Sequence, residues 1–399
     1  MIYRFGNCEL DPGRHVFLRD GDEMSLEPQV FDLLALFVAN SGKLIDRDRL
    51  MGEIWDGRIV SDAAVSSRIN SVRKAIGDTG KAQSMLQTVP RRGFRFVAAV
   101  EEQPTAARPA LAPVAAPSTE QVIRMTQSRD GTRIAYATTG DGPPLLRAGH
   151  FLTHLERDWD SPVWRPFLDR LGASFSVTRY DQRSTGLSEQ SVASLSLKCL
   201  VDDLEAVANA AGLDRFPLFA ASQGVPVAIA FAARHPDRVS CLSLYGGYAQ
   251  GRAHRAGEAE RQNAEAILTI IRQGWGRAGT AFARALSSLY MPDATHEQLA
   301  HMTEMQLASA SPENAVALRR AIDDFDVSDI LGEVRCPTLI LHVSEDAVHP
   351  VAQSGVLAAG IPGAEVHIMN GANHVPLPQD PCWTELLDRI EAYVAKHHV

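Results

Sequence analysis

The chain has 399 residues, of which 45% are hydrophobic and 22% charged, and its formal net charge at pH 7 is −9. This composition excludes an intrinsically disordered chain, and the length exceeds that of a single compact core, so we expect two folded domains. Residues 1–100 contain 14 basic and 13 acidic residues. Residues 101–399 contain 25 basic and 35 acidic residues, so the negative net charge belongs to the second part of the chain.

No stretch of the chain is expected to cross a membrane or to direct export. The longest apolar run, Val225 to Ala233, has nine residues, whereas a membrane-spanning helix needs roughly 18 or more. The N-terminal stretch MIYRFGNCELDPGRH has charges where a signal peptide would need an apolar core. Scattered cysteines without metal or redox spacing fit reduced thiols; they are Cys8, Cys199, Cys241, Cys336 and Cys382. We therefore expect a cytoplasmic protein with no membrane partner, no metal ion and no other cofactor.

The first hundred residues follow the pattern of a winged helix. Short alternating stretches, IYRFGNCEL and HVFLRD, precede three helical patterns, and LQTVPRRGFRFVAAV is typical of a hairpin with Gly93 at its turn. Charge within this segment is polarised, since residues 1–57 have six basic and eleven acidic residues whereas residues 58–95 have eight and two. One side of this small domain therefore suits a polyanion.

The third helical pattern, DAAVSSRINSVRKAIGD, has the properties of a DNA recognition helix. Its apolar residues recur at helical spacing and predict one buried stripe, made of Val65, Ile69, Val72 and Ile76. The opposite face carries polar residues that could approach base edges: Ser67, Asn70, Ser71 and Lys74. Arg68 and Arg73 on the flanks, with Arg91 and Arg92 in the hairpin, are placed to reach phosphates.

Residues 1–100 resemble an OmpR-type winged-helix DNA-binding domain. The resemblance rests on SLEPQVFDLLALFVANSGKLIDRDRL, IW, VSDAAVSSRINSVRKAIGD and TVPRRGFRF. It implies a helix in the major groove of double-stranded DNA, a wing on the backbone and binding as a homodimer. The phosphoacceptor domain of two-component members is absent, so another part of the chain must supply the signal. A winged helix used for protein contact is the alternative.

Residues 101–120 are rich in proline and alanine without apolar periodicity, which predicts a linker. After it, a hairpin turning at Asp130 and Gly131 precedes apolar runs that alternate with helical stretches. The runs are PPLLRAG, FSVTRYD, FPLFAAS, VSCLSLYGG, CPTLILHV and AEVHIMNG. Such alternation predicts a mostly parallel sheet with crossover helices, and residues 249–331 add helices alone.

Three residues at predicted strand ends occur in the order of a serine hydrolase triad. Ser222 follows FPLF and precedes a helix, Asp346 follows CPTLILHV, and His374 follows AEVHIM. A nucleophile, an acid and a base in this order are typical of acyl transfer on a parallel sheet. The oxyanion hole would use the N–H groups of Gln223 and Phe151. Glu345 remains as an alternative acid, and His349 and His367 as alternative bases.

Residues 121–399 resemble the α/β-hydrolase superfamily, on THLERDWDSPVW, RYDQRSTGLS, SQGVPVAIAFAARHPDRV and LYGGYAQGR. The chain departs from the family pattern at Ala220 and Ser184, where glycine is usual. The resemblance implies an α/β-hydrolase fold with the helices of residues 249–331 as a cap over the strand ends. Side chains expected to contact a small hydrophobic ligand are His150, Trp275, Phe282, Tyr290 and Met291.

The two parts together predict a one-component transcription regulator. Its hydrolase-like domain would bind, and hydrolyse, a small ester, lactone or thioester, and occupancy would bias DNA binding. Two alternatives remain open: a serine acyl hydrolase whose winged helix serves docking, and a catalytically inactive receptor with a hydrolase fold.

Overall fold

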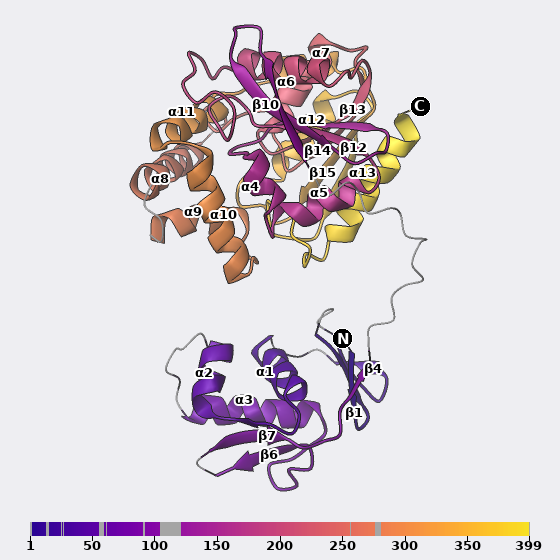
Figure 1. Cartoon of the computed structure of the whole chain (residues 1–399), viewed down its shortest axis with the longest axis vertical. Coiled ribbons are helices and arrows are strands. Elements are labelled where there is room, and N and C mark those ends of the chain that lie inside the picture. The colour runs from indigo at the N-terminus through magenta and orange to yellow at the C-terminus, as the bar shows by residue number, and fades with distance from the viewer. Residues whose placement is uncertain are drawn as a thin grey trace. The chain divides into compact units, whose positions relative to one another are not determined.

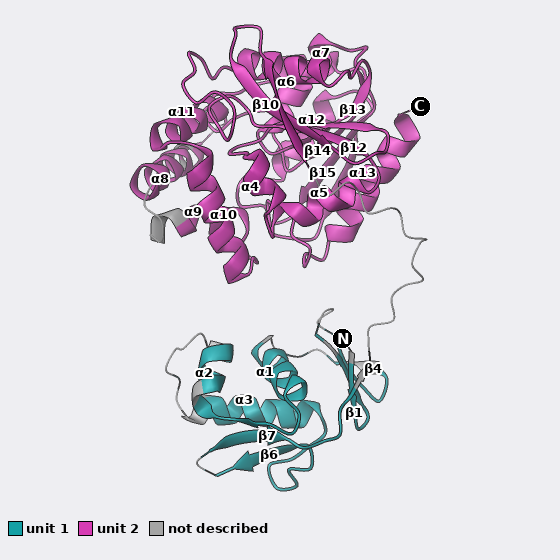
Figure 2. Cartoon of the chain, in the orientation of Figure 1, with its two compact units in different colours: residues 1–113 teal, residues 114–399 magenta. Residues whose placement is uncertain are grey.

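The computed structural model describes residues 2–12, 16–24, 26, 28–55, 60, 62–90, 92–103, 121–255, 257–275 and 281–398. The chain divides into two compact units, residues 1–113 and 114–399 (Figure 1, Figure 2). Each unit has its own hydrophobic core.

The first unit combines two small antiparallel sheets with three helices. Its five-stranded sheet has the order β4-β3-β2-β1-β8 and its three-stranded sheet the order β5-β7-β6. The strands are β1 (Ile2–Phe5), β2 (Cys8–Asp11), β3 (Val16–Arg19), β4 (Asp22–Glu23), β5 (Leu44–Ile45), β6 (Leu86–Val89), β7 (Gly93–Phe96) and β8 (Glu101–Gln103). The helices are α1 (Pro28–Ala39), α2 (Arg47–Trp55) and α3 (Asp62–Ala75). The predicted winged-helix arrangement, with its terminal hairpin, is confirmed.

Burial in α3 follows the predicted stripe. Val65, Ile69 and Val72 lie on one face and, with Ile76 just after the helix, are at most 5% exposed. They pack in one core with α1 and the strands, because residues three and four apart share a helix face. The opposite face of α3 is left at the surface of this unit.

The predicted linker begins too early in the sequence. Residues 101–103 form β8, which pairs antiparallel with β1 so that Ile2 lies opposite Gln103. The stretch EEQ is therefore the edge strand of the five-stranded sheet, next to β1. This strand was not predicted, because three consecutive polar residues show no alternation of apolar and polar positions. The rest of the predicted linker, residues 104–120, lies outside the described residues.

Asp78 fixes the segment that joins α3 to the β6–β7 hairpin. Its Oδ1 accepts the N–H groups of Thr79 (2.7 Å) and Ser84 (3.0 Å), and its Oδ2 those of Met85 (2.9 Å) and Leu86 (3.0 Å). Burial raises the pKa of this carboxyl, but the four backbone donors outweigh burial and lower the pKa to about 2. The ionised carboxylate therefore holds the hairpin on the end of α3.

Asp78→Ala is expected to lower the free energy of unfolding of residues 1–113 by about 2 to 3 kcal/mol, because four backbone N–H groups, of which that of Leu86 is buried, lose a charged acceptor. The pKa of Asp78 in the folded state lies below the ordinary value of 3.8. The carboxylate therefore gives its full stabilisation of the fold at pH values above 3.8, and this stabilisation is lost as the pH falls toward 2. Urea denaturation of the full chain at pH 7 and pH 3 measures both effects. Glu53→Ala, at an exposed pair with Arg49, is the control and should cost less than about 1 kcal/mol.

The second unit is built on an eight-stranded sheet of order β16-β15-β14-β13-β11-β12-β10-β9. The strands β9 and β10 form the predicted antiparallel hairpin and β10 is antiparallel to β12, whereas the other neighbours are parallel. The strands are β9 (Val122–Gln127), β10 (Arg133–Thr139), β11 (Pro144–Arg147), β12 (Ser176–Tyr180), β13 (Phe216–Ala221), β14 (Val239–Tyr245), β15 (Thr338–Val343) and β16 (Glu365–Met369). The predicted mostly parallel sheet is confirmed.

Helices cover both faces of this sheet because the side chains of its central strands are apolar on both sides. In β14, Leu242 and Leu244 pack in one core and Cys241 and Tyr245 in the other. One face is covered by α6 (Leu197–Ala210), α7 (Gly224–Arg234) and α12 (Ala352–Gly360), and the other by α5 (Trp164–Gly172) and α13 (Trp383–His397). The short α4 (Leu155–Trp159) precedes α5, and the 3-10 helix η1 (Ser328–Glu333) precedes β15.

Four further helices form the predicted cap. They are α8 (Glu258–Gly274), α9 (Ala281–Tyr290), α10 (His296–Ser309) and α11 (Pro312–Asp323), and they gather at the left of the sheet in Figure 1. Their apolar faces share a core with Leu152 and Trp164 on one side and with Val375 and Leu377 on the other. The cap therefore packs on loops that follow β11 and β16.

The sheet has a topological switch point between β11 and β13. Strand β11 pairs with β12 on one side and with β13 on the other. The chain leaves β11 toward α5 on one face and leaves β13 toward α7 on the opposite face. Loops that diverge in this way leave a crevice at the carboxyl ends of the strands, which is where ligands bind in open α/β sheets.

Within the described part of the chain, no helix is long and apolar enough to cross a membrane.

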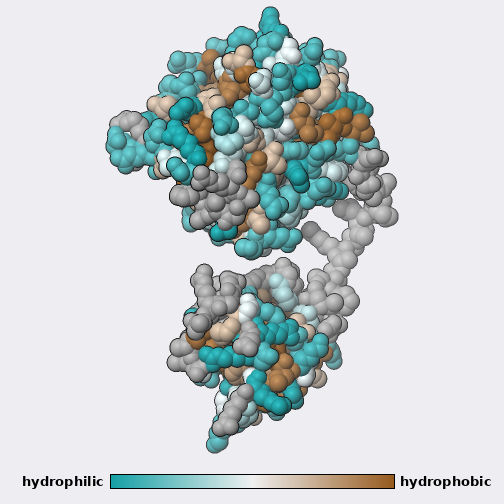
Figure 3. Space-filling view, turned by 60° about the vertical axis from the view of Figure 1, so that its left-hand side comes forward, coloured by the Kyte–Doolittle hydropathy of each residue, from teal (hydrophilic) through white to brown (hydrophobic). Residues whose placement is uncertain are grey.

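Hydrophilic residues cover most of the face drawn in Figure 3, and hydrophobic residues there form separate groups. The exposed large hydrophobic residues include Val122 and Met125 on β9 and Val366 and Ile368 on β16, which are the two edge strands of the large sheet.

Candidate active site and DNA interface

Ser222 occupies a sharp turn between β13 and α7. Its φ is 54°, a left-handed conformation, and its N–H donates to the Tyr245 carbonyl at 2.9 Å. A Cβ at Gly224 would lie 2.7 Å from the Gly149 carbonyl oxygen, so the turn requires glycine there. Ala220, where the family usually has glycine, lies fully buried inside β13 without a positive φ. Its methyl group therefore fits the turn.

The other departure, Ser184, has a structural cost. Its φ is 70°, and the residue is 1% exposed. Its hydroxyl has no hydrogen-bond partner among the described residues. A left-handed residue other than glycine costs about 1 kcal/mol. The turn after β12 therefore has the left-handed conformation that glycine adopts freely, and Ser184 adopts it with backbone strain.

Asp346 and His374 form a hydrogen-bonded pair at the ends of β15 and β16. The Nδ1 of His374 lies 2.7 Å from Oδ2 of Asp346, and Oδ1 accepts the N–H groups of Val348 (2.7 Å) and His349 (3.0 Å). Burial raises the pKa of Asp346, but His374 and the hydrogen bonds outweigh burial and hold it well below the ordinary value. An ionised Asp346 fixes the tautomer in which Nδ1 of His374 carries the proton.

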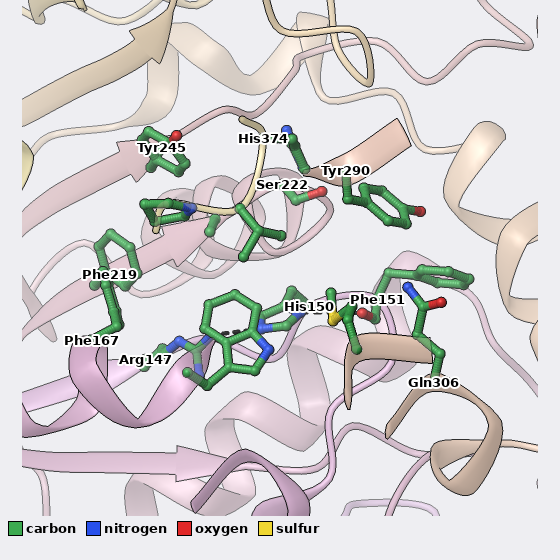
Figure 4. A pocket seen from close by; sticks show the side chains of 15 residues that line it. Arg147, His150, Phe151, Phe167, Phe219, Ser222, Tyr245, Tyr290, Gln306 and His374 are labelled. Carbon is green, nitrogen blue, oxygen red and sulfur yellow. Dashed lines mark hydrogen bonds between the residues drawn. The ribbon is translucent and has the colours of Figure 1, made fainter. Parts of the chain in front are cut away.

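His374 and Ser222 line the same cavity (Figure 4). Nε2 of His374 is buried and has no partner among the described residues. No hydrogen bond joins Ser222 to His374 within the described structure. Such bonds are often long without substrate and tighten when it binds. The alternative acid and bases, Glu345, His349 and His367, do not line this cavity.

His342, on β15, is a supporting residue that the sequence analysis missed. It is fully buried, and its Nδ1 lies 2.7 Å from the Ser354 hydroxyl. Its Nε2 lies 3.1 Å from the His349 carbonyl oxygen and 3.3 Å from Oδ2 of Asp346. His342 therefore positions the acid loop. The only indication of this role in the sequence is that His342 is a histidine within the otherwise apolar stretch TLILHV.

The cavity is small and mostly apolar. Its volume is about 40 Å³, where one ordered water needs roughly 10 to 15 Å³. The lining residues are Arg147, His150, Phe151, Trp164, Phe167, Phe219, Ala221, Ser222, Tyr245, Tyr290, Met302, Gln306, His374, Val375 and Pro376. They come from β11, β13, α5, the cap and the loop after β16, so the cavity lies at the switch point.

Two of the five side chains predicted to contact a ligand, His150 and Tyr290, line this cavity. The Tyr290 carbonyl also accepts the His374 N–H at 2.9 Å. Trp275 packs inside the cap and donates to the Ala310 carbonyl at 2.7 Å, and Met291 is fully buried in the same core. Neither side chain lines the cavity that Ser222 lines, because apolar residues of the cap serve first to hold its helices together. The side chain of Phe282 lies outside the described residues.

The predicted oxyanion donors lie beside the nucleophile. Phe151 lines the cavity, and Gln223 follows Ser222 directly as the N-cap residue of α7. Neither backbone N–H donates to a protein acceptor in the described structure. The Gln223 side chain donates from Nε2 to Oε1 of Gln182 at 3.1 Å, which fixes the start of the helix. Both amides therefore remain available to an oxyanion.

The candidate DNA interface lies on α3 and the β6–β7 hairpin. Ser67, Asn70 and Lys74 are exposed, Arg68 is partly exposed, and the Ser71 hydroxyl donates to the Ser67 carbonyl at 3.2 Å. Arg92 is exposed at the hairpin turn, whereas Arg91 lies outside the described residues. The polar face predicted for α3 is therefore a surface of the first unit.

Arg73 is placed differently from the prediction. Its side chain is buried, with the residue 6% exposed, and donates to the Leu86 carbonyl at 3.0 and 3.2 Å and to the Thr88 hydroxyl at 2.8 Å. Arg73 therefore joins α3 to β6 and does not present its guanidinium to phosphate. Its assignment to the DNA interface is wrong.

Among the described residues, no group of three or more His, Cys, Asp or Glu side chains could hold a metal ion.

Similarity to known proteins covers both units. The family model described as "Transcriptional regulatory protein, C terminal" matches residues 21–96, and that described as "alpha/beta hydrolase fold" matches residues 155–381. The chain is similar to the transcriptional activator CadC of Escherichia coli, with 31% identity over 100 residues, which are 25% of this chain and 20% of that protein. That similarity is thus confined to a fifth of CadC.

The second unit has longer matches. A putative carbamate hydrolase, RutD of Azorhizobium caulinodans, is 28% identical over 245 residues, which are 60% of this chain and 87% of that protein. A thermophilic esterase from Thermogutta terrifontis superimposes with a TM-score of 0.56 and 25% identity, covering 70% of this chain and all of the esterase. Since the hydrolase match spans more than half of the sequence, the chain belongs to the alpha/beta hydrolase fold family and carries an OmpR-type transcriptional regulatory domain ahead of it.

Proposed function

We propose that this protein is a cytoplasmic one-component transcription regulator whose hydrolase-fold domain binds and hydrolyses a small, largely hydrophobic acyl compound. The observation that carries the proposal is the hydrogen-bonded pair of His374 and Asp346 at a mostly apolar cavity that Ser222 also lines. A DNA-binding domain on the same chain makes occupancy of this cavity a signal.

The chemistry follows from the positions of these groups. Ser222 Oγ attacks the acyl carbonyl carbon while Nε2 of His374 takes the hydroxyl proton. The N–H groups of Gln223 and Phe151 stabilise the oxyanion. The leaving group departs with the proton held by His374 and leaves an ester on Ser222. Water then attacks this acyl-enzyme, with His374 as base, and releases the carboxylic acid.

DNA recognition is assigned to the exposed face of α3. Ser67, Asn70, Ser71 and Lys74 would face base edges in the major groove, with Arg68 and Arg92 on phosphates. Arg91 stays a prediction from the sequence. Two copies of the chain would bind repeated half-sites as a homodimer. CadC is a transcriptional activator, RutD is a putative carbamate hydrolase and the Thermogutta terrifontis protein is an esterase, so the similarities support the two halves of this proposal.

A ligand regulates DNA binding only if it favours one arrangement of the chain over another. Labelling Ser222 with a fluorophosphonate probe is therefore expected to change the affinity of the full chain for its DNA by at least about 5-fold. The DNA is a duplex selected from random sequences by the unlabelled protein, and fluorescence anisotropy gives the affinity. Ser222→Ala, treated with the same reagent, is the control. Complete labelling without a change in affinity would favour a hydrolase whose winged helix serves docking.

A further inference from the structure

A buried arginine lies at one end of the candidate active-site cavity. Arg147 is the last residue of β11, is 3% exposed, and lines the same cavity as Ser222 and His374 (Figure 4). Its strand, PLLR, is otherwise apolar. An arginine is almost never placed in such surroundings unless something pairs with it.

Only one of the three guanidinium nitrogens of Arg147 has a protein acceptor in the described structure. Its Nη2 lies 2.6 Å from Nε2 of His150, whereas Nε is buried without a partner and none is found for Nη1. Arginine only donates, so His150 must accept through Nε2 and donate from Nδ1 to the Phe151 carbonyl, 3.2 Å away.

His150 supplies no negative charge to this arginine. Burial, followed by the nearby charge of Arg147, holds the pKa of His150 well below its usual range, so the ring is neutral. Asp158 is the carboxylate that interacts electrostatically with Arg147, yet no hydrogen bond joins the two. Oδ2 of Asp158 lies 3.7 Å from Nη1 of Arg179, which shares the same carboxylate.

The guanidinium packs against aromatic rings. It lies 4.7 Å from the ring centroid of Trp164 and 5.8 Å from that of Phe167. Burial lowers the pKa of Arg147 to about 10, and the group still carries its charge at pH 7. A charged fork with unused donors, lining the same cavity as the nucleophile, is suited to receive a planar anion.

We propose that the acyl compound carries a carboxylate, which binds Arg147 while its acyl carbonyl lies at Ser222. This inference rests on the proposed function and narrows the substrate class to anionic acyl compounds such as half-esters of dicarboxylic acids. The apolar walls of the cavity contact the carbon chain between the two ends, and His150 keeps the guanidinium in place.

The test compares charged and neutral esters of equal length. The charged probes are 4-nitrophenyl hemisuccinate and 4-nitrophenyl hemiglutarate, and in each neutral partner an isopropyl group replaces the carboxylate. Wild-type full-length chain should prefer a charged ester by kcat/KM. Arg147→Met should lower that preference by about 10- to 100-fold, the range for a hydrogen bond to a charged group, and Arg147→Lys should retain part of it. Arg165→Met is the control, since Arg165 also stacks on a tryptophan, Trp159, but lies outside the cavity.

Binding to Ser222→Ala separates this inference from the proposed chemistry. Calorimetry with Ser222→Ala should show that the anionic ester, monomethyl glutarate, binds more tightly than the neutral ester, methyl 5-methylhexanoate. In the double variant that also carries Arg147→Met, the two esters should bind with equal affinity. If wild-type protein hydrolyses neither ester but the anion still binds through Arg147, the hydrolytic function fails and the inference stands. Equal binding of both probes, or a preference that is unaltered in a folded Arg147→Met, would overturn the inference. If Arg147→Met fails to fold, the wild-type preference and Arg147→Lys decide.

Discussion

Replacing Ser222 with alanine is expected to lower the turnover of 4-nitrophenyl butyrate by about 10⁴-fold or more. The hydroxyl oxygen is the atom that would form the acyl-enzyme, and neither His374 nor a backbone amide can take its place. Alanine tolerates the left-handed turn at φ 54° no worse than serine, so the loss would not reflect unfolding. Stopped-flow release of 4-nitrophenolate measures the rate, and mass spectrometry with a fluorophosphonate probe checks for a covalent adduct on Ser222.

Ser243→Ala is the matched control for this experiment. Ser243 lies in the neighbouring strand β14, is fully buried, and its hydroxyl has no partner among the described residues. It does not line the cavity, so its variant should keep wild-type turnover. Hydrolysis that persists in Ser222→Ala would remove the serine mechanism. A wild-type chain that binds acyl compounds but neither turns them over nor reacts with the probe would be a receptor with a hydrolase fold.

The candidate triad could be predicted because chain order and strand ends constrain where such residues lie. Ser222 is the first residue after β13, Asp346 the third after β15 and His374 the fifth after β16, and parallel strands bring their carboxyl ends to one edge of the sheet. The sequence could not supply the distance between these groups, which depends on sheet twist and on loop conformation. His342 was missed for the same reason, since its contact with Asp346 depends on how the loop after β15 folds back.

The DNA face was predicted less completely because a helical pattern gives the direction of a Cα–Cβ bond but not where a long side chain ends. Arg73 begins on the flank of α3, yet its guanidinium folds back to the Leu86 carbonyl, 13 residues away. Trp275 and Met291 show the same limit for apolar residues, because periodicity predicts burial but not whether a residue faces a cavity or a core. Arg147, by contrast, carried a readable signal: a charge inside the apolar run PPLLRAG.

Asp203→Ala is expected to lower the free energy of unfolding of the hydrolase unit by about 3 to 5 kcal/mol, because it leaves a buried arginine without its main partner. Arg183 and Asp203 are both completely buried. They form two hydrogen bonds, from Nε to Oδ2 at 2.8 Å and from Nη2 to Oδ1 at 2.6 Å. Arg183 also donates to Asp130 at 2.7 Å and to the Ser194 carbonyl at 3.2 Å. Arg183 lies in the loop that follows β12. Its guanidinium therefore connects this loop to α6, to the turn of the β9–β10 hairpin and to the segment that precedes α6.

Urea denaturation of the full chain measures this loss, with Asp169→Ala as the control. Asp169 pairs with Arg165 at 2.7 Å, but both side chains are at least one third exposed, so that change should cost less than about 1 kcal/mol. The transition of residues 1–113 should stay unchanged in both variants, since they form a separate compact unit. Equal losses in Asp203→Ala and Asp169→Ala would contradict the assignment, because they would mean that Arg183 finds other acceptors when Asp203 is removed. A large loss confined to Asp203→Ala would instead identify this ion pair as the contact that keeps the loop after β12 in place beneath the cap.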